Sequence, residues 1–165
     1  MQSIKDFGND ILEKDTYQSM KSYIQHGTIS VLEHSIRVAE TSLKIGKFLK
    51  DLGFSINLKD LVRGALLHDY FLYDWHKKED WHKWHGFHHA DTALKNASRD
   101  FELTEIEKEI IRCHMFPLNI TKIPKVMEAW IVTMADKYCS TVETLAMRNK
   151  KERVDNKSNL KAQES

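Results

Sequence analysis

The helix predicted at residues 58–69 has an inward face that is apolar at first and ends on His68 and Asp69. Its apolar positions are three or four residues apart: Leu58, Leu61, Val62 and Ala65. Residues at this spacing share one face of an α-helix. An imidazole and a carboxylate therefore fall where apolar side chains are expected, and burying them is costly unless each finds a polar partner.

The composition favours an all-α fold. Six glycines and two prolines leave little turn chemistry for a β protein of 165 residues, and long stretches carry helical apolar spacing. The length fits one domain. We expect a bundle of about six helices that forms a single domain over residues 1–147, followed by a charged helix end or disordered tail over residues 148–165.

Capping patterns indicate where these helices begin and end. Ser30 and Thr104 each precede a glutamate by three residues, which is the capping-box pattern, and Asn57 is a further N-terminal signal. Gly53 supplies a left-handed stop. The predicted helices cover residues 9–25, 31–52, 58–69, 90–99, 105–114 and 124–147, with an irregular connector over residues 70–88.

Charge and cysteine content argue against several classes of protein. The 25 basic and 24 acidic residues give a net charge of +1, so we expect no nucleic-acid partner. Cys113 and Cys139 are isolated and form neither a zinc-finger pattern nor a disulfide framework. The sequence shows no signal-peptide pattern and no long apolar run, so we expect a cytoplasmic protein without a membrane partner.

Three further predicted helices also place a polar residue on an apolar face: His34, His114 and Asp136. A single buried histidine is usually a hydrogen-bonded core residue, and a single aspartate usually caps a helix or pairs with a base. A divalent metal explains all of them by one cause, because it binds imidazole and carboxylate together and offsets their desolvation.

The connector contains five more histidines: His76, His82, His85, His88 and His89. They cannot all bind one metal centre. His89 is the preferred candidate, because it immediately precedes a predicted helix that would hold its side chain rigidly. The others are interpreted as pocket lining or surface residues, and His85 is the nearest rival of His89.

The ordered set of His34, His68-Asp69 and Asp136 resembles the HD superfamily of metal-dependent phosphohydrolases. The resemblance rests on the motifs LEHSIRVAE, RGALLHD and VTMADKYCS and covers roughly residues 28–145. It implies a bundle of at least five helices with a metal site between them. Dinuclear members add two histidines, and the motifs HADTAL and IIRCHMFP match these, which selects His89 over His85 and adds His114.

The extended pattern is similar to that of bacterial dinucleoside-tetraphosphate hydrolases and cyclic-dinucleotide phosphodiesterases, and it also occurs in the di-iron oxygenase branch typified by myo-inositol oxygenase. Many of the phosphodiesterases carry a lysine three residues after the HD pair, where this chain has Leu72. This departure weakens the cyclic-dinucleotide assignment. The aromatic segment YFLYDWH is expected to line a different pocket.

The resemblance implies one or two divalent transition metals, Fe, Mn, Co or Zn, with a dinuclear centre favoured. Asp69 would bridge the metals, with His34, His68 and Asp136 on one and His89 and His114 on the other. We expect a phosphohydrolase that uses metal-bound hydroxide to cleave a phosphate ester or anhydride, with a nucleotide as substrate.

Arg37 and Lys137 are candidates to contact a substrate phosphate, although either can equally be a solvated surface charge. Two alternative functions stay open. The same ligands would serve a di-iron oxygenase, and an HD domain can also act as a non-catalytic ligand-binding module. The sequence leaves the substrate, the metal and the oligomeric state undetermined.

Overall fold

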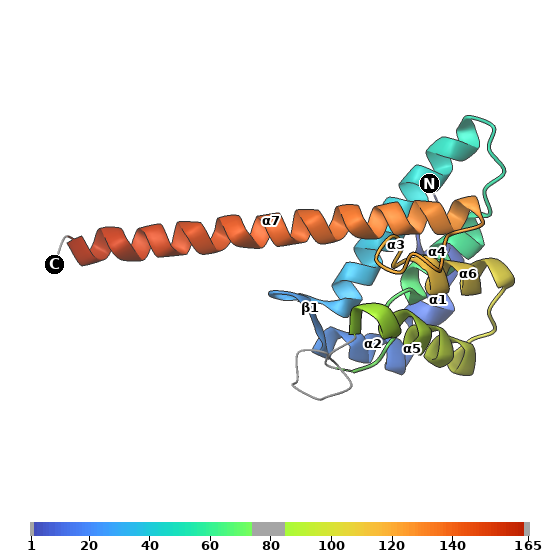
Figure 1. Ribbon diagram of the computed structural model, residues 1–165, viewed down its shortest axis with the longest axis horizontal. Coiled ribbons are helices and arrows are strands. Elements are labelled where there is room, and N and C mark those ends of the chain that lie inside the picture. The colour runs from blue at the N-terminus through green and yellow to red at the C-terminus, as the bar shows by residue number, and fades with distance from the viewer. Residues whose placement is uncertain (1, 74–84, 164–165) are drawn as a thin grey trace.

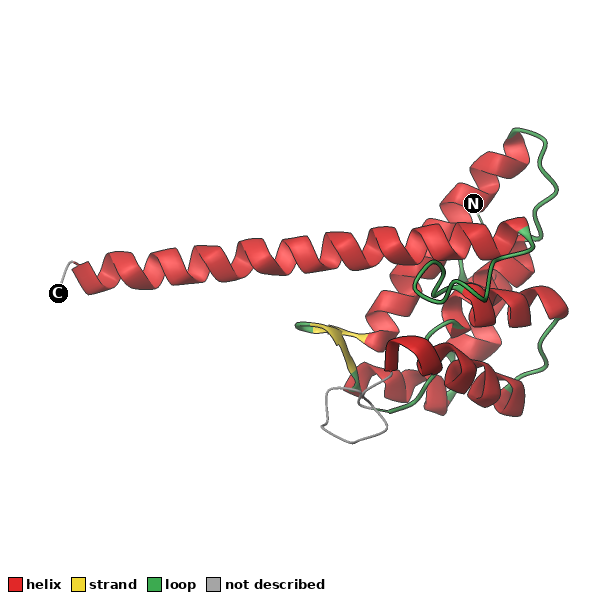
Figure 2. Cartoon of the chain, viewed as in Figure 1, coloured by secondary structure: helices red, strands yellow, loops and turns green. Residues whose placement is uncertain are grey.

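A bundle of helices surrounds one buried helix, α4 (Leu58–Leu67). The computed structural model describes residues 2–73 and 85–163, without the side chains of residues 26, 85–87 and 150–163. Within these residues the chain forms seven α-helices, one short 3-10 helix and one β-hairpin (Figures 1 and 2). The all-α expectation is confirmed.

The remaining elements follow in chain order. They are α1 (Lys5–Leu12), α2 (Asp15–Gln18), the 3-10 helix η1 (Ser19–Ser22), β1 (Ile24–His26), β2 (Ile29–Ser30), α3 (Val31–Asp51), α5 (His85–Asp100), α6 (Glu105–Cys113) and α7 (Met127–Gln163).

Helix α4 is the centre of the bundle, because every one of its residues except Lys59 is buried. Helices α1, α3, α6 and α7 all pack against it. Its apolar residues belong to the main hydrophobic core. The end of α4, where His68 and Asp69 lie, is therefore enclosed by the other helices.

The predicted capping patterns are present. The hydroxyl of Ser30 accepts a hydrogen bond from the Glu33 amide, and Glu33 in turn accepts one from the Ser30 amide, as in a capping box. Thr104 begins α6 in the same way, and the side chain of Asn57 caps α4. Gly53, with φ of 95°, follows α3 in the left-handed conformation that favours glycine.

The single helix predicted over residues 9–25 is wrong. Helix α1 ends at Leu12, and Lys14 is extended before the short α2 begins. Tyr23 is also extended, and its carbonyl accepts a hydrogen bond from the Val31 amide beside the β1–β2 hairpin. Burial of Tyr17 and the formation of this hairpin outweigh the helical preference of the segment.

Two other helix boundaries differ from the prediction. Helix α5 begins at His85 rather than Ala90, so His89 lies within the helix and not just before it. Pro124 lies before the first turn of α7, which begins at Met127 and continues to Gln163 rather than ending near residue 147. The division into a domain of residues 1–147 and a tail stays a prediction.

Helix α7 extends beyond the bundle (Figure 1), but it is not an apolar helix. Among the described residues, no helix combines the length and the hydropathy needed to cross a bilayer.

Gly64 allows α4 and α6 to approach closely, and substituting it tests this packing. A Cβ atom at this position would lie 2.6 Å from Cδ1 and 2.9 Å from Cβ of Ile110. For Gly64→Ala we expect a loss of about 1–2 kcal/mol in the free energy of unfolding, because overpacking outweighs the gain in helix propensity. Chemical denaturation measures it. The exposed Lys95→Ala on α5 should change stability little, and an equally stable Gly64→Ala would contradict the close contact.

Candidate metal centre

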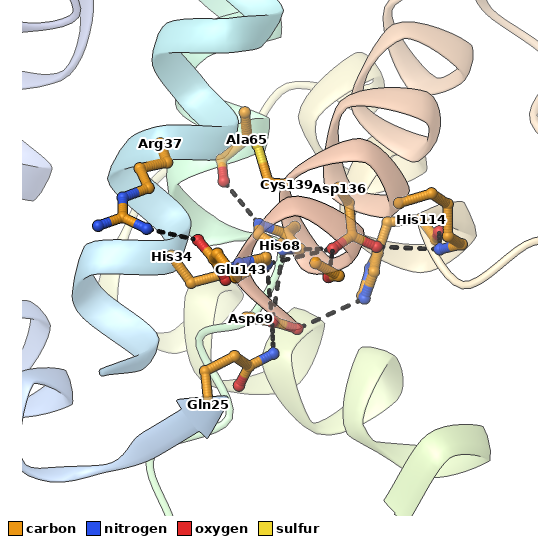
Figure 3. A network of polar contacts seen from close by, with 12 residues as sticks. Gln25, His34, Arg37, Ala65, His68, Asp69, His114, Asp136, Cys139 and Glu143 are labelled. Carbon is orange, nitrogen blue, oxygen red and sulfur yellow. Dashed lines mark hydrogen bonds and ion pairs between the residues drawn. The ribbon is translucent and has the colours of Figure 1, made fainter. Parts of the chain in front are cut away.

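The six predicted ligands converge from five helices. His34 lies on α3, His89 on α5 and Asp136 on α7, while His68 and His114 follow the last residues of α4 and α6 directly. Asp69 is next to His68. All six are buried, with exposed fractions of at most 7%. Figure 3 shows five of them with their side chains directed toward one another.

The six residues form two groups of possible ligand atoms. One group consists of His34, His68 and Asp136, and the other of Asp69, His89 and His114. Within each group the ligand atoms all lie within 4.8 Å of one another. Each group combines imidazole and carboxylate, the ligand types that divalent transition metals accept.

The carboxylate of Asp69 lies between the two groups. Its Oδ2 is 3.4 Å from Nε2 of His68 and 4.0 Å from Nε2 of His34. Its Oδ1 is 3.3 Å from Nε2 of His89 and 3.5 Å from Nε2 of His114. One oxygen therefore faces each group, which is the arrangement that a bridging carboxylate requires.

Backbone contacts fix the orientation of two of the rings. Nδ1 of His68 lies 2.7 Å from the carbonyl oxygen of Ala65, and Nδ1 of His114 lies 2.8 Å from that of Ile111. A carbonyl only accepts hydrogen bonds, so in both rings Nδ1 carries the proton. In the neutral rings Nε2 then has the free lone pair, and it is Nε2 that faces the cluster.

Several buried atoms of the cluster lack hydrogen bonds. Within the described residues, Nε2 of His68 and Oδ1 of Asp69 are buried without a hydrogen-bond partner. They lie close to other cluster atoms, but these approaches do not have hydrogen-bond geometry. Nε2 of His89 and Nε2 of His114 are 2.9 Å apart and share a hydrogen bond. Buried ligand atoms that converge and leave two of their number without a hydrogen bond are expected of a metal site, so the residues present fit a metal.

The electrostatics of the cluster favour ionised carboxylates. Burial by itself would raise the pKa of Asp69 and Asp136, but the neighbouring imidazoles hold the pKa of both carboxyls well below its usual range. Burial lowers the pKa of His114 to about 4, which keeps this ring neutral at pH 7. Both carboxylates and this imidazole are thus in the protonation states in which they bind metals.

The pKa of His34 is shifted in the opposite direction. Burial lowers its pKa, but its hydrogen bonds to Asp136 and Glu143 outweigh this effect and raise the pKa to about 10. The ring contacts a carboxylate on each side, at 3.1 Å from Nε2 to Asp136 and 3.0 Å from Nδ1 to Glu143.

Glu143 is a site residue that the sequence interpretation missed. It is 2% exposed, and its Oε2 accepts the hydrogen bond from Nδ1 of His34. A carboxylate in this position orients a ligand histidine and raises its basicity. The sequence contained the signal, because the inward stripe of α7 through Asp136 and Cys139 reaches Glu143 one turn later.

Gln25 was missed as well, and no periodic signal identifies it. It lies on β1, and its side-chain amide donates a 2.8 Å hydrogen bond to Oδ2 of Asp69 (Figure 3). Its Oε1 atom is buried and, among the described residues, has no hydrogen-bond partner. The hairpin thus brings a polar side chain from outside the helical bundle onto the central carboxylate.

The two predicted phosphate contacts lie in different settings. Nη1 of Arg37 is 3.2 Å from Oε1 of Glu143, on the side of that carboxylate away from His34, and the Arg37 side chain is half exposed (Figure 3). Nζ of Lys137 donates to Oδ2 of Asp136 at 2.9 Å and to the carbonyl of His114 at 2.8 Å. Lys137 is therefore nearer the possible ligands than Arg37, and both roles stay predictions.

Among the other histidines of the connector, only the side chain of His88 is described, and it does not join the cluster. His88 is exposed on α5, next to the buried His89. His76 and His82 lie outside the described residues, and so does the side chain of His85. The structure therefore places His89 in the cluster without testing its nearest rival.

The expectation that the aromatic segment after the HD pair lines a pocket is wrong for its first two residues. Tyr70 and Phe71 belong to the hydrophobic core. The Tyr70 hydroxyl bonds to Thr16 and Asp100, and the Phe71 ring contacts His89 edge-on, with centroids 5.9 Å apart. Residues 74–76 of this segment lie outside the described residues.

Comparison with known proteins identifies one family. No curated protein and no solved structure was significantly similar to the chain. The HD domain family matches residues 31–141, which include all six residues of the cluster. Since this match covers more than half of the chain, the protein belongs to the HD domain family, whose members are mostly metal-dependent hydrolases.

Proposed function

We propose that this protein is a metal-dependent phosphohydrolase that cleaves a phosphate ester or anhydride of a nucleotide. The observation that carries the proposal is the position of Asp69, whose two carboxylate oxygens each face a different group of ligand atoms. Membership of the HD domain family supports it. The proposed centre is dinuclear.

His34, His68 and Asp136 would hold one metal ion, and His89 and His114 the other, with Asp69 bridging the two. Bound divalent metals would supply positive charge and Lewis acidity, which neutralise the negative charge on phosphate oxygens and activate water for in-line attack at neutral pH. The buried position of all six residues limits the access of bulk water to these groups.

The surrounding residues of the chain hold the ligands in place. Ala65 and Ile111 fix two rings through their carbonyl oxygens, and Glu143 fixes His34. Gln25 holds Oδ2 of Asp69 and leaves its own Oε1 available to accept a hydrogen bond. Lys137, whose side chain is partly exposed beside Asp136, is the best-placed cation for a substrate phosphate.

Metal analysis of histidine variants tests the dinuclear assignment. We expect about two metal equivalents in the wild type and about one in His89→Ala and in His114→Ala, because each loses a ligand of the second ion. Asp69→Ala should lose most of both. His88→Ala is the matched control, since His88 is exposed on the same helix, and it should keep the wild-type content. Unchanged stoichiometry in both ligand variants would indicate a mononuclear centre.

Glu143 should affect metal affinity without binding metal itself. We expect Glu143→Gln to weaken metal binding about tenfold and Glu143→Ala about 100-fold, because the His34 ring loses its charged acceptor. Isothermal titration with Mn²⁺ measures both. Glu105→Gln removes an exposed carboxylate from α6 and should bind like the wild type. Equal affinities for all four proteins would show that Glu143 does not support the ligand set.

A substrate screen tests the activity. We expect the protein loaded with Mn²⁺ or Fe²⁺ to release phosphate or a nucleoside monophosphate from nucleotides, dinucleoside polyphosphates or phosphate monoesters. Asp69→Ala should reduce the rate of this release at least about 1,000-fold. Oxygen uptake by anaerobically prepared Fe²⁺ protein is recorded in parallel. Oxygen uptake without phosphate release would establish the oxygenase alternative. If neither activity is detected, the ligand-binding module is the remaining alternative.

A further inference from the structure

Helix α7 carries an exposed apolar stripe on the face opposite the metal centre. We define the α7 stripe as Met127, Trp130, Met134, Tyr138, Val142 and Leu145, which are 38–63% exposed. They are three or four residues apart and so share one face of the helix. Asp136 and Glu143, on the other face, are buried in the bundle.

The exposed surface of this part of α7 carries little charge, because the 38% exposed side chain of Lys137 is paired with Asp136. Between Met127 and Ala146, where every side chain is described, each residue classed as exposed is uncharged. Lys137 is partly buried and bonded to Asp136, and the exposed cations Lys125 and Arg148 lie beyond the two ends. In a chain with 30% charged residues, this leaves a long apolar surface with few of the charges that solubilise a protein.

The patch is as large as a protein interface. At roughly 200 Å² for a fully exposed large side chain, the α7 stripe presents about 600 Å². The loop before α7 adds Leu118, Ile120 and Ile123, which are 50–71% exposed. Together these residues present about 950 Å², compared with the roughly 800 Å² that each partner contributes to a standard interface.

We propose that a second copy of this chain covers the α7 stripe, with the two α7 helices antiparallel about a two-fold axis. A mainly apolar surface offers little to a partner recognised by its charge, whereas it is complementary to an equal apolar surface. The chain itself supplies such a surface. An anionic membrane is less suitable, since the flanking cations Arg37 and Lys137 are already paired with Glu143 and Asp136.

The length of α7 supports this arrangement. Residues 148–163 continue the helix past the bundle (Figure 1), over about 24 Å. In an antiparallel pair, the projecting end of each α7 passes the start of the other, where Leu118, Ile120 and Ile123 are exposed.

Sedimentation velocity of the full chain, over micromolar concentrations, tests the proposal. We expect the wild type to have twice the mass of the 19.4 kDa chain. Met134→Lys combined with Leu145→Lys should weaken association at least about 100-fold, because each charge would be buried without a partner. Phe48→Lys is the matched control: Phe48 is 63% exposed on α3, outside the α7 stripe, and its variant should remain dimeric.

Circular dichroism and metal content should be the same in all of these variants, since the substituted residues do not face the metal centre. A wild type that is monomeric at every concentration overturns the proposal, as does a double variant that remains dimeric. Flotation of monomeric wild type with phosphatidylserine vesicles, lost in the double variant, would overturn it in favour of a membrane surface.

Spin labels attached to Leu145→Cys test the orientation. If the two-fold axis passes through the middle of the stripe, Leu145 lies about nine residues from it. In two antiparallel helices the labelled positions are then about 27 Å apart along the helix direction. A parallel pair would bring them side by side. The native Cys113 and Cys139 are buried, which limits labelling to the new thiol. A short distance would overturn the antiparallel arrangement.

Discussion

The burial of the Asp69 carboxylate is the constraint on which the rest of the structure depends. Asp69 is 2% exposed at the end of the central helix, where an isolated charge would be prohibitive. The neighbouring imidazoles from α3, α4, α5 and α6 supply its environment, and Gln25 adds a hydrogen bond from the hairpin. Most elements of the fold therefore meet at this one group.

Two helices use the same device to orient a ligand. His68 follows the last residue of α4 and His114 the last residue of α6, and each bonds through Nδ1 to the carbonyl three residues before it. The last carbonyls of a helix have no partner within the helix, so this contact satisfies one of them. It also leaves Nε2 facing the cluster. The same hydrogen bond therefore satisfies a carbonyl at the end of the helix and orients the ligand.

Much of the fold and part of the site could be predicted from local pattern. The capping residues Ser30, Asn57 and Thr104 begin helices as expected, because a cap depends only on residues within one turn. Glu143 could have been found by extending the inward stripe of α7 by one turn. Residues 9–25 were predicted wrongly, because pairing in a hairpin and burial against distant helices determine their conformation.

The sequence by itself determined which residues are inward and polar, since helical spacing places His34, His68, Asp69, His114 and Asp136 on apolar faces. Only the tertiary structure decided how they are grouped. The contacts of Asp69 with His89 and His114 join residues 20 and 45 positions apart. The contact from Gln25 to Asp69 and the support of His34 by Glu143 join residues 44 and 109 positions apart. Periodicity describes one helix at a time, whereas these contacts depend on how the helices pack against one another.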